Sequence, residues 1–272
     1  VRWYNITLVM LAQYLASVYV LNPGVPAMEV LADPYLHLML FSTACVIASG
    51  FIINSFYDLE KDIINRPGSV VFSRLVSQQT CLNFYFFFNT MGMILSFYVS
   101  KRIMLFNFLF SIALWFYSHK LKKVVLVGNI AATLLTVAPF LIIVLYYKEV
   151  NFAIFFYVAF MALVVVTREI VKDIIAEKGD VIYGYHTLPV DLGRRRTKLI
   201  LTGFILLTFI PPVLLYFTYA IGQVIWYFAL SYLLLVVAGV LVWQAKNRTD
   251  YERINNLYKF LILSGILSLV LV

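Results

Sequence analysis

The chain has 272 residues, of which 63% are hydrophobic and only 12% are charged, and its mean hydropathy is +0.92. A soluble domain cannot bury that much apolar surface, whereas helices that span a bilayer expose it to lipid. The composition therefore excludes a soluble globular protein and predicts an all-α polytopic membrane protein. The net charge of +8 does not require a nucleic-acid partner, and we expect none, because cytoplasmic loops, anionic headgroups or an anionic substrate account for it.

Nine apolar runs of membrane-spanning length follow one another along the chain, separated by polar breaks. We place the spans at about 3–20, 35–57, 82–99, 103–117, 124–146, 152–170, 199–219, 223–243 and 257–272. We expect long polar loops before Lys198 and over 244–256, and a single transmembrane domain over 1–272. Pro211 and Pro212 are expected to kink the seventh span, and Gly92, Gly128 and Gly203 to allow close contact between helices.

The distribution of loop charges tests this count, because cytoplasmic loops of membrane proteins are rich in Lys and Arg. With a cytoplasmic amino end, all but three of the 21 Lys and Arg residues fall on the cytoplasmic side, and the exceptions are Lys101, Arg102 and Lys148. Moving the count by one helix would destroy this asymmetry. We therefore expect a multi-pass protein of the cell membrane with a cytoplasmic amino terminus.

The second span ends in the acidic stretch Asn54-Ser55-Phe56-Tyr57-Asp58-Leu59-Glu60-Lys61-Asp62. On a helix, Asn54, Asp58 and Asp62 have the spacing i, i+4, i+8 and share one face over roughly 12 Å of axis. One carboxamide and two carboxylates are good oxygen ligands for a hard divalent cation. Taken alone, the motif is explained equally well by a solvated helix end.

A second acidic stretch, from Arg168 to Asp180, follows the sixth span. Glu169, Asp173 and Glu177 repeat the i, i+4, i+8 spacing and Asp180 follows three residues later, so all four can lie on one helix face. The two stretches contain seven of the 13 acidic residues. Like charges around one cavity repel unless a cation lies between them, so the pairing favours a metal site over two solvated helix ends.

Basic residues accompany both acidic stretches. They are Arg66 and Arg74 after the first, Lys120, Lys122 and Lys123 at the end of the fourth span, and Arg168, Lys172, Arg194, Arg195 and Arg196 at the second. The positive-inside rule explains most of them taken singly. Together with the acids they indicate a site for a magnesium-bridged polyphosphate, in which carboxylates hold metal and cations hold phosphate oxygens.

With these motifs the chain resembles, over essentially its whole length, the UbiA superfamily of intramembrane prenyltransferases. In that family nine helices surround a central cavity, with N-x-x-x-D-x-x-x-D after helix 2 and a second Asp-rich motif after helix 6. Asn54, Asp58 and Asp62 match the first motif completely. Arg168-Glu169-x-x-Lys172-Asp173 with Gly179-Asp180, and Tyr117-Ser118-x-Lys120-Leu121-Lys122 followed by Gly128-Asn129, resemble the branch of digeranylgeranylglyceryl phosphate synthases, chlorophyll synthases and homogentisate prenyltransferases. Two positions depart from the family: Ser69 stands where an Arg is usual, and Ala176 where an acid is frequent.

The resemblance implies a magnesium-dependent enzyme that moves a prenyl group from an isoprenoid diphosphate, with geranylgeranyl diphosphate expected, to a lipid-soluble acceptor on the cytoplasmic side. It implies catalytic roles for Asp58, Asp62, Asp173 and Asp180. It implies two Mg²⁺ ions, one held by Asn54, Asp58 and Asp62 and one by Asp173, Glu177 and Asp180. The diphosphate would be bound by Arg66, Lys120, Lys122, Arg168 and Lys172, and Tyr57, Tyr117 and Tyr183 would line the substrate pocket.

The sequence leaves the acceptor of the prenyl group undecided. The second motif and the extra bases favour a geranylgeranylglyceryl phosphate-type lipid over an aromatic quinone precursor of the 4-hydroxybenzoate, dihydroxynaphthoate or homogentisate type. A cation-coupled secondary transporter is the alternative from another class. It is disfavoured because transporters place ionisable groups near the bilayer midplane and show repeats, whereas these acids lie at helix ends and no clear repeat is evident. We expect no obligatory protein partner.

Overall fold

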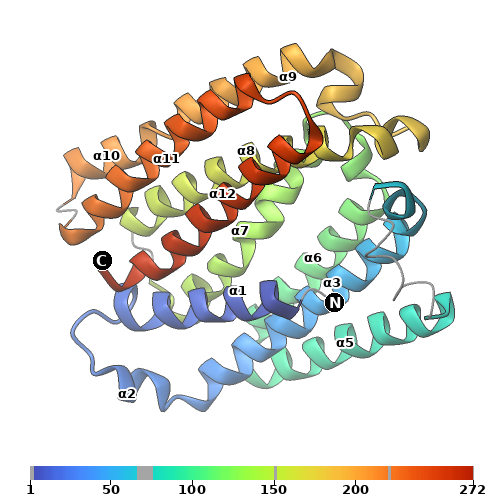
Figure 1. The fold of residues 1–272 in the computed structure, drawn as a ribbon. Coiled ribbons are helices and arrows are strands. Elements are labelled where there is room, and N and C mark those ends of the chain that lie inside the picture. Colours follow the sequence, from blue (N-terminus) through green and yellow to red (C-terminus); the bar gives the residue numbers. More distant parts are fainter. Residues whose placement is uncertain (1–2, 66–75, 150–151, 220–221, 272) are drawn as a thin grey trace. The chain divides into compact units, whose positions relative to one another are not determined.

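The computed structural model describes residues 3–65, 76–149, 152–219 and 222–271. These residues are almost entirely helical and contain no strand, which confirms the all-α expectation (Figure 1). They form two compact units: Val1–Lys122 with Ala138–Glu149, and Lys123–Val137 with Val150–Val272. The single domain over 1–272 stays a prediction.

The first unit is built around α3 (Pro34–Asn65), a helix of 32 residues that packs against α1 (Trp3–Leu15), α5 (Gln78–Val99) and α6 (Lys101–His119). A π-helical turn, Ala16–Val20, continues α1, the short helix α2 (Ala27–Leu31) precedes α3, and the carboxyl-terminal part of α7 (Val127–Tyr147) completes the unit.

A buried polar contact joins three helices of this unit. The Asn107 side chain of α6 donates hydrogen bonds to the hydroxyl oxygens of Ser42 on α3, at 3.2 Å, and Ser96 on α5, at 2.7 Å. Because a lipid-embedded polar group has no water to bond, partners inside the protein hold it at a defined position.

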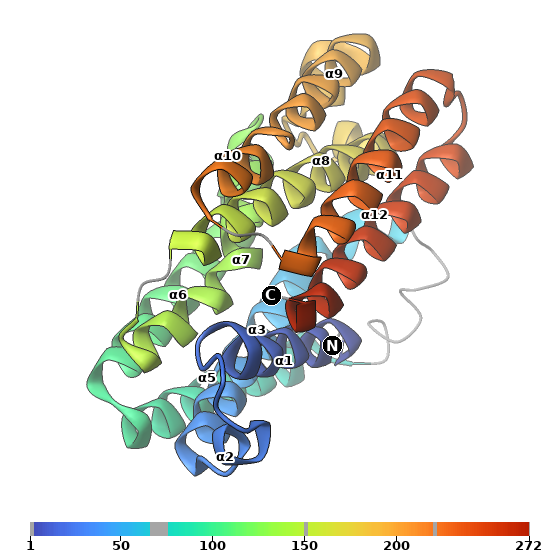
Figure 2. The same ribbon diagram turned by 90° about the vertical axis from the view of Figure 1, so that its left-hand side faces the viewer.

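The second unit is arranged around α8 (Phe152–Ile182), which packs against α9 (Leu188–Leu207), α10 (Ile210–Thr218) and α12 (Arg248–Ser268). Helix α11 (Ile225–Gln244) lies beside α12 and contacts α9 (Figure 2). Aromatic rings hold α8 to α11: Phe160 meets Phe228 edge-on, with 5.2 Å between the ring centroids. Tyr258 of α12 is fully buried in the same core.

Within the described ranges, seven helical segments are long and apolar enough to cross a bilayer: 34–65, 78–99, 127–147, 154–182, 188–218, 222–244 and 248–271. The chain is therefore a multi-pass membrane protein. Two of the nine predicted spans are not among the seven, since α1 has only 13 residues and α6 begins with two charged residues. The count of nine spans and the cytoplasmic amino terminus stay predictions.

The two polar loops expected before Lys198 and over 244–256 are largely helical, so the prediction of loops was wrong there. α9 begins at Leu188, with a kink at Gly193 where φ is +76°, and α12 begins at Arg248 with an Asn247–Asp250 capping box. Capping bonds and the burial of Tyr251 and Ile254 stabilise helical turns whose composition is polar. Ahead of Pro211, the helix is interrupted as expected, since α9 ends at Leu207 and α10 begins at Ile210.

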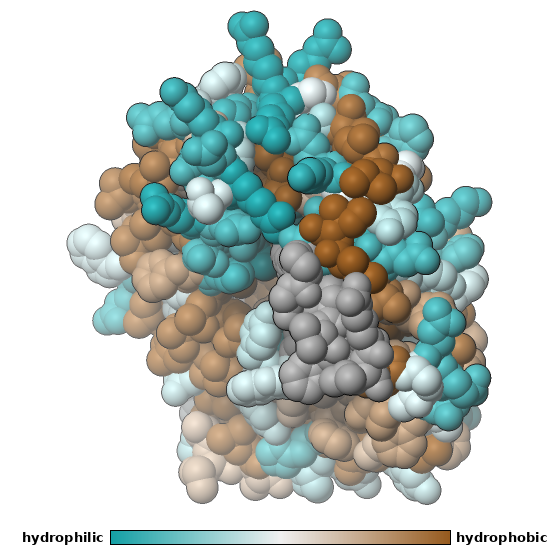
Figure 3. All heavy atoms as spheres, turned by 45° about the vertical axis from the view of Figure 1, so that its right-hand side comes forward, coloured by the Kyte–Doolittle hydropathy of each residue, from teal (hydrophilic) through white to brown (hydrophobic). Residues whose placement is uncertain are grey.

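Hydrophilic side chains gather at one end of the second unit. In the face drawn in Figure 3, the teal residues collect toward the top, over the region where α8 ends and α9 and α12 begin. Hydrophobic residues predominate lower in the view. This separation is typical of a helix bundle whose polar end leaves the bilayer.

Gly92 and Gly203 give a stability test with a built-in control. A Cβ at Gly92 would lie 2.8 Å from Val46 Cγ2 and 3.0 Å from the backbone oxygen of Ser42, whereas a Cβ at Gly203 meets nothing within 4 Å among the described residues. The predicted close contact is thus confirmed for Gly92 and wrong for Gly203. We expect Gly92→Ala to lower the free energy of unfolding by about 1–3 kcal/mol through overpacking, and Gly203→Ala to leave it unchanged or raised. Unfolding in detergent measures both, and equal destabilisation would contradict the packing of α5 on α3.

Candidate active site

The first acidic motif lies on α3, which continues as one helix through the motif to Asn65. The spacing of Asn54, Asp58 and Asp62 therefore places all three on one helix face, as expected. Asp58 is only 9% exposed, and Asn54 and Asp62 are half-buried. A carboxylate this far from solvent needs a positively charged or hydrogen-bonding partner.

Lys122 supplies that partner. It lies in the short 3-10 turn Leu121–Lys123 that follows α6, and it is itself only 9% exposed. Its Nζ donates to Asp58 Oδ1 at 2.7 Å and to Asn54 Oδ1 at 3.4 Å. Lys61 Nζ lies farther from the same Asp58 oxygen, at 3.9 Å. Oxygen atoms from two turns of α3 thus converge on a single cation.

Three aromatic side chains, packed one on the next, lie beside this ion pair. Lys122 Nζ lies 5.8 Å from the centroid of the Tyr57 ring, within the range of a cation–π contact. The Tyr57 ring packs on His119 with 5.3 Å between centroids, and His119 stacks on Trp115 at 5.4 Å. Tyr57, expected in the substrate pocket, therefore lies directly beside the first motif.

The second motif lies on α8, which extends through it to Ile182. Each of three acids expected to bind metal accepts a hydrogen bond from outside α8. Asn129 Nδ2 donates to Asp173 Oδ2 at 2.6 Å, Arg194 Nε to Glu177 Oε2 at 2.7 Å, and Thr187 Oγ1 to Asp180 Oδ2 at 3.3 Å. Such bonds orient a carboxylate before it binds a ligand.

Two bases expected to bind diphosphate lie next to Glu169. Lys172 Nζ donates to Glu169 Oε2, and Arg168 Nη1 lies 4.0 Å from Glu169 Oε1. Arg168 Nε also donates to Asn255 Oδ1 of α12 at 3.1 Å. Both basic side chains are half-buried and Glu169 is only 9% exposed, so the two cations compensate a carboxylate that is withdrawn from solvent.

The other residues predicted for the diphosphate site and the substrate pocket lie at several different places in the chain. Lys120 is exposed at the end of α6, Tyr117 is half-buried within α6, and Tyr183 is exposed just after α8. Arg66 and Arg74, like Ser69, lie outside the described residues. Their expected roles stay predictions.

The structure adds two residues that sequence reasoning did not assign to the site, Asn129 and Thr187, and it gives a defined partner, Glu177, to a third, Arg194. Asn129 carried a signal, because Gly128-Asn129 belongs to the stretch that resembles the family branch. Arg194 was noted only as a member of a basic run. Nothing in the sequence distinguishes Thr187, whose hydroxyl reaches Asp180 because the chain turns back after α8.

The donor chemistry of both motifs fits Mg²⁺. Among the described residues, no three His, Cys, Asp or Glu side chains cluster as a ready metal site. Mg²⁺ does not require such a cage, since it is commonly bound through one or two carboxylates, with waters and substrate phosphates supplying the remaining oxygens. Asn54 and Asp58 already direct oxygen atoms at one cation, the Lys122 ammonium.

A sequence model of the UbiA prenyltransferase family matches residues 9–265. That match covers nearly the whole chain, including both acidic motifs and Lys122. The chain belongs to this family. As a UbiA prenyltransferase, it is an enzyme of prenyl transfer, and the residues that match the family model include both acidic motifs.

Named relatives of this UbiA-family chain are digeranylgeranylglyceryl phosphate synthases. That of Methanococcoides burtonii is 28% identical over 259 residues, covering 88% of this chain and 87% of its own. That of Thermococcus gammatolerans is 33% identical over 213 residues, covering 78% and 75%. That of Pyrococcus abyssi is 34% identical over 193 residues, covering 70% and 67%.

Solved structures support the UbiA fold. One concerned with digeranylgeranylglyceryl phosphate synthase in membranes has a TM-score of 0.70 at 22% identity and covers 98% of this chain and 93% of that one. A UbiA homolog from Archaeoglobus fulgidus, bound to GPP and Mg²⁺, has a TM-score of 0.68 at 16% identity and covers 99% and 96%. At these identities the likeness establishes the fold.

Two lysines that contact the same carboxylate test the role of Lys122. Lys122→Ala removes the cation 2.7 Å from Asp58, and we expect prenyl transfer, measured as kcat/KM, to fall about 10²–10³-fold, as when an electrostatic group is removed from an active site. Lys61→Ala removes a cation 3.9 Å away, and a weak ion pair of this kind predicts a change below about fivefold. Thermal unfolding of both variants checks folding, and equal losses of activity would contradict a special role for Lys122.

Proposed function

We propose that this chain transfers a geranylgeranyl group from geranylgeranyl diphosphate to the free hydroxyl of a geranylgeranylglyceryl phosphate-type lipid. The bond between C1 of the donor and the diphosphate oxygen breaks, an ether bond forms between C1 and the acceptor oxygen, and the hydroxyl proton is released. Inorganic diphosphate is the second product. The named synthase relatives support the choice of donor and acceptor.

The observation that carries the diphosphate chemistry is the convergence of Asn54 and Asp58 on Lys122. Carboxylate and amide oxygens hold one cation there, beside three aromatic side chains. A diphosphate with its metal ions presents both signs of charge, so an acidic helix face and an adjacent lysine match its two parts.

We assign two Mg²⁺ ions to the motifs. Asn54, Asp58 and Asp62 would hold one, and Asp173, Glu177 and Asp180 the other. When bound, Mg²⁺ neutralises charge that develops on the departing diphosphate. GPP and Mg²⁺ in the Archaeoglobus fulgidus homolog support this choice of ion, and the number of ions rests on the two motifs.

The protein's own side chains would prepare ionisation of the donor. Lys122 and Lys120 would neutralise phosphate oxygens at the first motif, and Arg168 and Lys172 at the second. The bonds from Asn129 to Asp173 and from Thr187 to Asp180 hold the carboxylates in position. The Tyr57 ring would shield the allylic carbon from water and face its developing positive charge.

We also propose that the enzyme lies in the cell membrane with both motifs at the cytoplasmic face, and that it needs no protein partner for catalysis. The bias of Lys and Arg toward the loops on the motif side supports this orientation. Family membership favours prenyl transfer over the transporter alternative.

A panel of acceptors tests the proposed reaction. Purified protein, Mg²⁺ and labelled geranylgeranyl diphosphate are incubated with geranylgeranylglyceryl phosphate, 4-hydroxybenzoate, dihydroxynaphthoate or homogentisate, and products are identified by mass spectrometry. We expect the digeranylgeranyl ether with the glyceryl lipid, and its loss when EDTA removes Mg²⁺. Prenylation of an aromatic acceptor alone would overturn the lipid assignment while preserving the prenyltransferase chemistry.

A further inference from the structure

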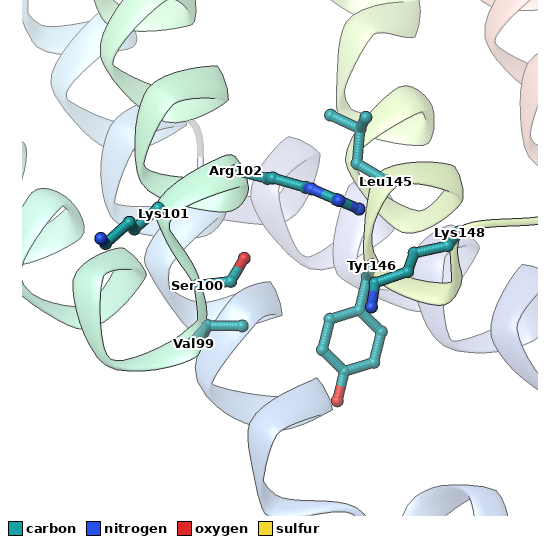
Figure 4. A pocket seen from close by; sticks show the side chains of 7 residues that line it. All are labelled: Val99, Ser100, Lys101, Arg102, Leu145, Tyr146 and Lys148. Atoms are coloured by element: carbon teal, nitrogen blue, oxygen red, sulfur yellow. The ribbon is translucent and has the colours of Figure 1, made fainter.

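A cavity of about 410 Å³ lies in the first unit, away from both acidic motifs. It is formed where α6 begins and α7 ends, and Ser100, Arg102, Tyr146 and Lys148 are among its lining residues. Figure 4 shows Arg102 and Lys148 reaching from these two elements into the same space. Lys101 also lines the cavity, but its amino end points away from that space.

The cavity lies at the end of the unit opposite Asp58. The Tyr146 hydroxyl donates to the carboxylate of Asp33, the residue that immediately precedes α3. Asp58 follows 24 residues after the start of α3, which is roughly 36 Å along the helix axis. That length exceeds the apolar thickness of a bilayer, about 30 Å, so the cavity faces the leaflet opposite the proposed diphosphate site.

The cavity is lined by basic residues, although basic residues are rare on the side of the protein opposite the acidic motifs. Arg102, Lys148 and Lys101 are the three bases that the predicted topology separates from all other Lys and Arg residues. All three are exposed, and none forms an ion pair within the described residues. Of the nearby acids, Asp33 is bonded to Tyr146, and Glu149 is exposed beyond Lys148.

The backbone at the start of α6 also suits an anion. Ser100 caps α6 by accepting a bond from Ile103 N at 3.2 Å, which leaves its hydroxyl hydrogen able to donate. The first N–H groups of a helix carry partial positive charge. Lys148 follows the last residue of α7 with φ +59°, a left-handed conformation that favours glycine. A lysine at this position puts a charged side chain at the cavity, at a cost in backbone strain.

We propose that this cavity binds the phosphate group of an anionic membrane lipid, clamped between Arg102 and Lys148, with the Ser100 hydroxyl as a further donor. Arg and Lys are suited to phosphate oxygens. Leu145, which is 39% exposed, lines the same cavity and gives an acyl chain an apolar surface beside the charges. Because the cavity shares no residue with the diphosphate site, this inference does not depend on the proposed reaction.

Native mass spectrometry of the purified full-length chain tests the proposal. The protein is released from neutral detergent containing phosphatidylglycerol, phosphatidylcholine or inorganic phosphate at equal phosphate concentration, without Mg²⁺. We expect one phosphatidylglycerol bound more tightly than the rest, and a fall in its affinity of about fivefold for each base removed in Arg102→Gln and Lys148→Gly. Lys148→Gly also relieves the left-handed strain, so a thermal midpoint at or above that of the wild type separates lost binding from lost folding.

Lys101→Gln is the matched control, since it removes the same charge from a side chain that points away. We expect it to keep the tightly bound lipid, and all three variants to keep prenyl transfer. An equal loss in Lys101→Gln, or full binding in Lys148→Gly, would overturn the site. If inorganic phosphate binds the wild type as tightly as phosphatidylglycerol, and does so through Arg102, the lipid assignment is overturned in favour of a free phosphate.

Discussion

The bond between the Lys122 ammonium and the Asp58 carboxylate is the contact on which the first half of the candidate site depends. It ties the turn after α6 to the carboxyl-terminal end of α3. Both groups are nearly buried, so the short ion pair compensates two charges in a medium of low polarity. The same contact brings the Asn54 carbonyl oxygen and the Tyr57 ring to the cation, and it thereby arranges acid, base and aromatic face in one place.

In the second unit, neutral and charged hydrogen-bond donors likewise hold the acidic side chains in position. Asp173, Glu177 and Asp180 project from α8, and each is held by a residue from another part of the unit. Two of these donors, Asn129 and Thr187, are neutral, and the third, Arg194, is charged. Such hydrogen bonds orient the carboxylates before a ligand binds.

Helical periodicity made the acidic faces of α3 and α8 predictable from the sequence. The i, i+4, i+8 spacing on α3 and α8 depends only on local geometry, so the faces bearing Asp58 and Asp173 could be read from the sequence. The partners could not, because Asn129 reaches Asp173 across 44 positions and Lys122 reaches Asp58 across 64. Composition gave a wrong expectation for two polar stretches. The one before Leu257 is helical because a capping box and buried side chains outweigh its polarity, and the one before Lys198 buries Leu188. Gly203 resembled Gly92 in sequence and differs only in its tertiary surroundings.

The central claim is that both acidic motifs contribute to binding of the diphosphate donor with Mg²⁺. Binding of a non-reactive geranylgeranyl thiodiphosphate, measured with and without Mg²⁺, tests it most directly. Asp58→Asn and Asp173→Asn should each weaken binding in the presence of Mg²⁺, because each removes a carboxylate proposed to hold a metal ion. Unchanged binding in either variant that remains folded would contradict the claim.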